Sequence, residues 1–183
     1  MSGGMVTTNV SGKADVVLTT KGDSVWYSDQ RVRKAVGNNS ATLFADSTET
    51  DGSKWDYPTT SFVVACSNET DDLTTGDDKL QFRMPFQFEL TDIIANVNTN
   101  PTGADLHVMV QEDDADIMSG NGIEIDAGDT TSESATTQPT ITESTLAFNS
   151  IISVDLDQVG STLAGTGLKI NFIGYRVIWI VQI

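Results

Sequence analysis

Carboxylates are the most abundant residues in this sequence that could do chemistry. The 183 residues include 26 Asp and Glu and only 10 Lys and Arg. In the run QEDDAD at residues 111–116, Asp113, Asp114 and Asp116, together with Glu112, offer the hard oxygen ligands that calcium prefers. The run lacks a regular Asp-x-Asp-x-Asp-Gly spacing. A solvated hairpin tip is therefore the first interpretation, and a calcium site is the second.

The side chains that usually support catalysis are scarce. His107 is the only histidine, and it alternates with the apolar residues Leu106 and Val108, so we expect it on the solvent-facing side of a strand. Cys66 is the only cysteine and ends the apolar run SFVVAC, which predicts a buried, inert thiol. Zinc-ligand spacing and a glycine-rich phosphate loop before a helix are missing. We expect no enzyme activity, cofactor or metal; a glycosidase-like enzyme would need two carboxylates about 5–9.5 Å apart in a groove.

The clearest structural pattern is the run LQFRMPFQFELT at residues 80–91. Apolar and polar residues alternate through all of it, which predicts one long strand with an apolar and a polar face. Pro85 lacks an N–H, so it belongs at a bulge or on an unpaired side. After Leu90 the apolar positions shift by one residue, which predicts a bulge or bend near Thr91 and Asp92.

Other short alternating segments, separated by turn residues, predict eight or nine strands and no helix. They support an all-β fold: an antiparallel β-sandwich of jelly-roll type, preceded by an extended, β-rich N-terminal attachment arm. We expect the arm at residues 1–58 and the sandwich, a knob domain, at residues 59–183. The predicted strands of the knob are centred on residues 61–66, 80–91, 106–110, 123–125, 152–156 and 168–172.

Two groups of apolar residues are candidate interfaces. The arm has no segment able to bury a core alone, so its large aromatic residues either anchor it on a partner or pack on this chain's own main domain. Near the C-terminus, five consecutive apolar residues predict a strand that is buried on both faces or meets another subunit. The candidates are Trp26, Tyr27, Phe44 and Trp55 in the arm, and Val177, Ile178, Trp179, Ile180 and Val181 near the C-terminus.

The formal net charge of −16 limits the possible partners. No Lys or Arg occurs between Arg83 and Lys169. Such a chain repels phosphate backbones and anionic lipid, so we expect no nucleic-acid or membrane partner. The charge favours solubility at high copy number, and a cationic partner or bound cations are the alternative. The N-terminal sequence lacks the apolar core of a signal peptide, so we expect the protein to be made in a host cytoplasm.

Two ordered series of short motifs resemble virion proteins of tailed bacteriophages. The first resembles a repeat near the start of fibre and decoration proteins, and the second resembles a β-sandwich domain of tail-fibre tips and head-attached fibres. The first series is Thr19-Thr20-Lys21-Gly22-Asp23, Arg33, Val36-Gly37, Leu43, Ala45-Asp46-Ser47, Gly52 and Lys54-Trp55. The second is Asp72-Leu73-Thr74-Thr75-Gly76, Phe82-Arg83-Met84-Pro85-Phe86, Pro101-Thr102-Gly103, Asp126-Ala127-Gly128, Asp155-Leu156-Asp157-Gln158-Val159-Gly160-Ser161 and Gly165-Thr166-Gly167-Leu168-Lys169.

The resemblance implies a non-enzymatic structural protein on the virion surface, usually a homotrimer. The expected partners are other virion proteins, with the major capsid protein first and tail proteins as the alternative. The sequence lacks the shaft of a long tail fibre, which favours a capsid decoration or cement protein of head-fibre type. The competing hypothesis is a receptor-binding tail fibre or tip that binds a host surface glycan.

Overall fold

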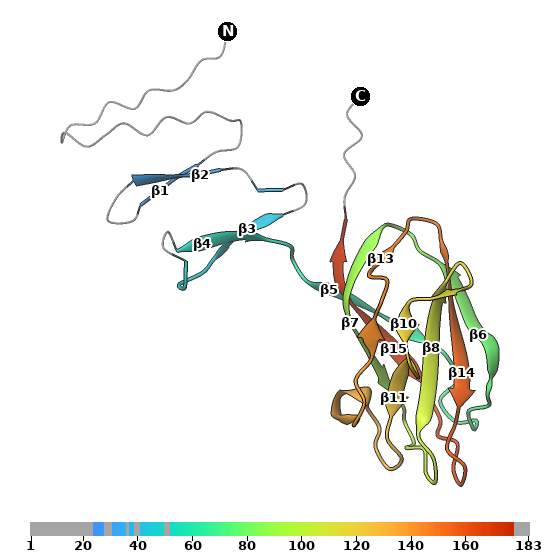
Figure 1. Cartoon of the computed structure of the whole chain (residues 1–183). Helices are drawn as coiled ribbons and strands as arrows, with labels where there is room; N and C mark the ends of the chain where they lie inside the picture. Colours follow the sequence, from blue (N-terminus) through green and yellow to red (C-terminus); the bar gives the residue numbers. More distant parts are fainter. Residues whose placement is uncertain (1–23, 28–30, 36, 39–40, 50–51, 178–183) are drawn as a thin grey trace, which may run out of the picture. The chain divides into compact units, whose positions relative to one another are not determined.

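The computed structural model describes residues 24–27, 31–35, 37–38, 41–49 and 52–177 (Figure 1). The chain divides into two compact units, with the boundary between Pro58 and Thr59. Strands dominate both units, and one short 3-10 helix, η1 (Ser132–Ser134), is the only helical element among these residues. No helix in the described part of the chain is long and apolar enough to cross a membrane.

The first unit contains two antiparallel hairpins. In one, β1 (Ser24–Tyr27) pairs with β2 (Arg31–Lys34). In the other, β3 (Thr42–Ala45) pairs with β4 (Ser53–Asp56). The sequence also indicated β-prone segments at residues 16–18, 24–27 and 41–44. Strands β1 and β3 correspond to the second and third of these, β2 and β4 were not predicted, and residues 16–18 lie outside the described residues.

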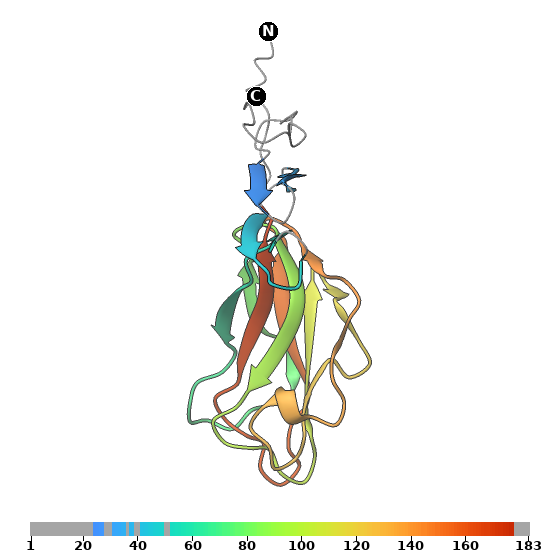
Figure 2. The ribbon, with the colours of Figure 1, turned by 90° about the vertical axis from the view of Figure 1, so that its left-hand side faces the viewer.

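Two antiparallel sheets form the second unit (Figure 2). Across one sheet the order is β11 (Ile123–Ile125), β8 (Leu106–Glu112), β14 (Ile151–Gln158) and β6 (Gly76–Arg83), with β9 (Ala115–Asp116) also pairing with β8. Across the other it is β13 (Thr145–Leu146), β7 (Phe88–Asn96), β15 (Lys169–Arg176) and β5 (Thr60–Ala65). A small separate pair joins β10 (Met118–Ser119) to β12 (Thr140–Ile141). The predicted all-β, antiparallel sandwich is confirmed.

The connections bring the two ends of this unit together. From β5 to β8 the chain changes sheet at every step, and it does so again from β13 to β15. As a result β5, the first strand, lies beside β15, the last, and β6 lies beside β14. In Figure 2 the long strands run in similar directions, so most loops gather at the two ends of the sandwich. The free edges of the two sheets at β5 and β6 become important for the site described below.

One prediction about the run at residues 80–91 is wrong. The run forms two strands: β6 ends at Arg83, β7 begins at Phe88, and they belong to different sheets. Between them residues 84–87 form a corner that contains Pro85, whose missing N–H suits a position without a strand partner. The predicted alternation of burial holds across the corner, because a corner between two facing sheets keeps the same side of the chain turned toward the core. Its inward residues are Leu80, Phe82, Met84, Phe86, Phe88 and Leu90.

The predicted bulge near Thr91 is confirmed. Leu90 pairs with Gly174 and Asp92 pairs with Ile173, so Thr91 is the extra residue. Its hydroxyl donates a hydrogen bond to the carbonyl oxygen of Ile173 at 3.2 Å. Gly174 is required here because a Cβ at this position would lie 1.9 Å from the carbonyl oxygen of Glu89. The bulge turns both Leu90 and Ile93 toward the core, which an uninterrupted strand cannot do.

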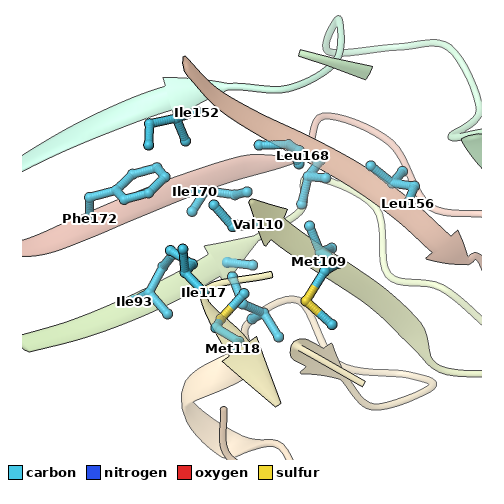
Figure 3. Packing of buried hydrophobic residues seen from close by; sticks show 14 of the residues in the cluster. Ile93, Met109, Val110, Ile117, Met118, Ile152, Leu156, Leu168, Ile170 and Phe172 are labelled. Atoms are coloured by element: carbon cyan, nitrogen blue, oxygen red, sulfur yellow. The ribbon is translucent and has the colours of Figure 1, made fainter. Parts of the chain in front are cut away.

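Side chains from both sheets meet in one hydrophobic core (Figure 3). Four phenylalanines form its aromatic part: Phe62 stacks on Phe172 with ring centroids 4.9 Å apart, and Phe82 and Phe88 meet Phe62 edge-on. Phe88 and Phe172 are fully buried. Aliphatic residues of the inner strand faces complete the core: Leu106, Val108, Val110, Ile123, Ile125, Ile152, Val154, Leu156, Leu168 and Ile170.

Candidate functional site

An apolar groove lies along the side of the sandwich where the edges of the two sheets face each other. Strand β5 is the last strand of its sheet, and β6 is the last strand of the other. The groove is lined by Phe62 and Val64 of β5, by Phe82 and Arg83 of β6, and by Pro85 and Phe86 of the corner that follows β6. Its volume is about 360 Å³. The sandwich therefore leaves part of its aromatic core open to the outside.

The groove follows directly from the strand patterns. Residues 62 and 64 share one face of β5, and both contact the buried core while remaining half-exposed. Phe82 is also half-buried, because no further strand of the described chain covers β6 on its outer edge. Arg83 donates a hydrogen bond to the carbonyl oxygen of Asn149 at 2.9 Å, which holds its side chain at the rim. Arg83 is the only charged residue that lines the groove, so the groove suits binding of an apolar surface rather than acid–base chemistry.

The last described residue of the chain contacts the corner at residues 84–87, which contributes Pro85 and Phe86 to the groove. Val177 is half-buried, and its N–H donates to the carbonyl oxygen of Gln87 at 3.0 Å. The guanidinium of Arg176 lies 4.9 Å from the centre of the Phe86 ring, a cation–π contact. Of the apolar C-terminal residues predicted at an interface, Val177 is thus placed. Ile178, Trp179, Ile180 and Val181 lie outside the described residues.

Of the four aromatic candidates in the first unit, only Phe44 and Trp55 have side chains that the structure describes. Trp26 and Tyr27 lie on β1, opposite Val32 and Arg31, and their side chains lie outside the described part. Phe44, on β3, is 37% exposed.

Trp55, on β4, is half-buried within its own unit. Its indole N–H donates to the carbonyl oxygen of Ala35 at 2.7 Å. A Cβ at Gly37 would lie 2.5 Å from the Trp55 ring, so the ring packs directly on this glycine. The sequence prediction treated all four aromatic residues as equal candidates for an interface. The contacts of Trp55 instead stabilise the first unit itself. Of the two described side chains, Phe44 is therefore the better candidate for contact with a partner.

The structure does not gather the predicted calcium ligands into a cluster. Asp113 and Asp114 occupy the turn between β8 and β9 with φ of 48° and 65°, as a two-residue hairpin turn requires. Asp113 Oδ1 accepts a hydrogen bond from the N–H of Ile151 at 2.9 Å, and Asp116 Oδ1 accepts one from Gln111 at 2.8 Å. These carboxylates complete the turn and its neighbouring strand.

A different cluster of possible ligands lies on the outer face of the five-stranded sheet. Among the described residues, the only group of three or more His, Cys, Asp or Glu whose ligand atoms all lie within 4.8 Å of one another is Asp105, His107 and Glu124. His107 lies on the outer face of its strand, as expected, but only 17% of its side chain is exposed. The sequence did not show the reason, which is that strand pairing places Glu124 of β11 directly opposite it.

Cys66 was predicted to be a buried thiol, and the structure shows it partly buried. It packs against the core and its Sγ lies 3.7 Å from the carbonyl oxygen of Val64. Burial raises its pKa to about 12, against a backbone hydrogen bond that acts in the opposite direction. At neutral pH the thiolate, which is the reactive form, is therefore nearly absent.

The carboxylate of Asp155 lies in an environment that disfavours its negative charge. Asp155 of β14 lies on the outer face of its sheet and is only 7% exposed. Burial raises its pKa, and the nearby charges of Asp77, Asp78 and Asp157 act in the same direction, against a hydrogen bond at 2.7 Å from the N–H of Asp78. The ionised form of Asp155 therefore destabilises the folded protein.

Replacing Asp155 with Asn should raise the stability of the protein at pH 7. The amide oxygen can still accept the hydrogen bond from Asp78, while the buried charge is removed. Because the pKa of Asp155 is higher in the folded state than its ordinary value of 3.8, protonation stabilises the fold as the pH falls through the folded pKa. The advantage of Asp155→Asn should shrink between pH 7 and pH 4 in urea unfolding.

The control for this prediction is Asp72→Asn, which removes one charge from an exposed position. It should give a smaller change in the unfolding midpoint at pH 7. Equal stabilisation by the two variants would show that total charge, not the site of Asp155, sets the effect.

Comparison with known proteins found no matching family model, no matching curated protein and no matching solved structure. The functional argument therefore depends on the residues and geometry of this chain.

Proposed function

We propose that this protein is a non-enzymatic structural protein on the surface of a tailed bacteriophage particle, where it acts as a homotrimeric capsid decoration or cement protein. The apolar groove between β5 and β6 is the observation that carries this proposal. It opens the aromatic core along one side of an otherwise acidic molecule, and an apolar surface of this kind is typical of a site that another protein covers.

The order of strands supports the same proposal. We infer a jelly roll from the two sheets, because β5-β15-β7-β13 faces β6-β14-β8-β11, the order that two interlocked Greek keys produce. Jelly rolls form capsid and lectin domains, so the fold allows both a decoration protein and a glycan-binding tip. The motif resemblance in the sequence supplies the link to phage virions.

The alternative, a receptor-binding or glycan-binding tail-fibre protein, has less support from the side chains. Sugar binding commonly uses flat aromatic rings beside polar loops. Residues 59–177 contain no tryptophan. Phe148, which is 70% exposed, is the large apolar side chain that projects most from the described part of the sandwich. A single exposed phenylalanine is a weak basis for glycan recognition.

Removal of residues 1–58 tests the proposal. The second unit has its own core and sheets, so the fragment 59–183 should fold and stay soluble. We expect it to be missing from purified particles of the phage that encodes it, whereas the full chain should be present in hundreds of copies per particle by quantitative mass spectrometry.

Two results would contradict the proposal. If the fragment joins particles as efficiently as the full chain, the attachment role of the first unit is wrong. If the full chain is present in a handful to a few dozen copies and binds to a glycan array, the protein belongs to the tail and recognises the host.

A further inference from the structure

We propose that Asp105, His107 and Glu124 form a binding site for a divalent transition-metal ion of the zinc type. The site lies on the outer face of the five-stranded sheet, where the ion would connect the edge strand β11 to β8. This inference concerns a feature away from the apolar groove and does not depend on the proposed function.

Strand pairing fixes the relative positions of the three residues. Glu124 pairs directly with His107, and the next pair along the ladder is Ile125 with Leu106. Because Leu106 and Ile125 are buried in the core, the flanking residues 105, 107 and 124 belong to the opposite, outer face. One ligand atom from each of the three residues lies within 4.8 Å of the others. Rigid strands thus hold three ligands at one place.

The distance between the imidazole and the carboxylate fits a shared ion. His107 Nε2 lies 3.4 Å from Glu124 Oε2. A direct charge-assisted hydrogen bond would be about 2.7–2.9 Å long. Two ligands that are each about 2.0–2.2 Å from a tetrahedral zinc ion lie roughly 3.3–3.6 Å apart. The observed separation falls in the range expected for two ligands of one metal ion.

Burial and charge also point to a cation. Glu124 is only 7% exposed, and His107, at 3.4 Å, is the one ion-pair partner of its carboxylate among the described residues. Buried carboxylates are normally paired or bound to a metal. Asp105 brings a second carboxylate to the site, and among the described residues neither carboxylate forms an ion pair with Lys or Arg.

The nearby carboxylate of Asp126 also has an oxygen whose negative charge is not balanced by a partner. Asp126 directly follows β11, and it is two residues from Glu124 on the strand that carries the site. Its Oδ2 accepts hydrogen bonds from the N–H and hydroxyl of Thr136, but its Oδ1 is buried without any hydrogen-bond partner. A metal ion or its bound water would offset negative charge that this end of the sheet leaves unpaired.

The ligand types select the class of metal. One imidazole nitrogen and two carboxylate oxygens suit zinc, whereas calcium prefers ligands that are all oxygen. Asp105 is already oriented, because its Oδ1 accepts a hydrogen bond at 2.8 Å from the N–H of Ala127, an outer contact of the kind that positions metal ligands. A water molecule would complete a tetrahedral site. The ion would hold β11, a strand of three residues, at the edge of the sheet.

The test uses the full chain after treatment with EDTA and dialysis. Zinc chloride added to the wild-type protein should bind with one ion per chain in calorimetry and should raise the melting temperature, because a ligand that binds the folded state stabilises it. Calcium chloride at the same concentration should have little effect. Cobalt chloride should produce visible absorption bands of tetrahedral cobalt, which report the ligands directly.

Two variants and a matched control decide the outcome. His107→Gln and Glu124→Gln should each weaken zinc binding at least 10-fold and abolish the cobalt bands, whereas Asp113→Asn at the hairpin tip should leave both unchanged. Asp105→Asn, at a less buried position, gives the same readout if a β-strand variant fails to fold. Absence of zinc binding in the wild type, or binding that survives in Glu124→Gln and Asp105→Asn, would overturn the proposal.

Discussion

Replacing Phe172 with alanine is expected to lower the free energy of unfolding by about 3–5 kcal/mol. Phe172 lies in the middle of β15 and has no exposed surface. Its ring stacks on Phe62 at 4.9 Å and meets Phe82 edge-on at 6.0 Å. Truncation removes these contacts and leaves a cavity where both sheets meet, so the loss includes both the transfer of the ring and the unfilled space.

Urea unfolding at equilibrium, followed by circular dichroism, measures this effect. The matched control is Phe148→Ala, which makes the same chemical change at a side chain that is 70% exposed. It should change the free energy of unfolding by at most about 0.5 kcal/mol. If the two variants are equally stable, the four-phenylalanine cluster is not the centre of the core.

The sequence predicted the main features of this core because burial follows a simple period. The alternation over residues 80–91 correctly identified every inward residue, and the shift after Leu90 correctly located the bulge at Thr91. It did not identify the corner at residues 84–87. An alternating pattern continues unchanged when the chain passes from one sheet to the facing one, so periodicity alone cannot distinguish one long strand from two. Pro85 was the available signal, and it marks the corner.

The candidate sites were harder to predict because they depend on pairing between distant strands. The groove exists because Phe62 of β5 and Phe82 of β6 lie on the free edges of different sheets, and sequence alone does not show which strands are edges. The partnership of His107 with Glu124 likewise depends on the register between β8 and β11. By contrast, Asp113 and Asp114 were correctly placed at a hairpin tip, because the turn is formed by residues next to one another in the chain.

The proposed trimer depends on an apolar surface, and the groove is the surface that the described chain offers. We expect Val64→Glu to convert the assembly to monomers. Val64 lies on edge strand β5 and lines the groove with Phe62 and Phe82. A carboxylate there would have to be buried against a partner's apolar surface without a counter-ion, and such burial costs several kcal/mol, enough to dissociate a complex. Size-exclusion chromatography with light scattering measures the mass directly.

Val63→Glu is the control because it differs by one position. Val63 points to the opposite side of the sheet from Val64 and is already 62% exposed, so the added charge remains in water. The trimer should persist in Val63→Glu and be lost in Val64→Glu, while both variants keep the circular dichroism spectrum of a folded β protein. If both dissociate, the interface uses the edge and outer face of β5 rather than the groove. If neither does, the subunits associate elsewhere, and the groove loses its role in the proposed function.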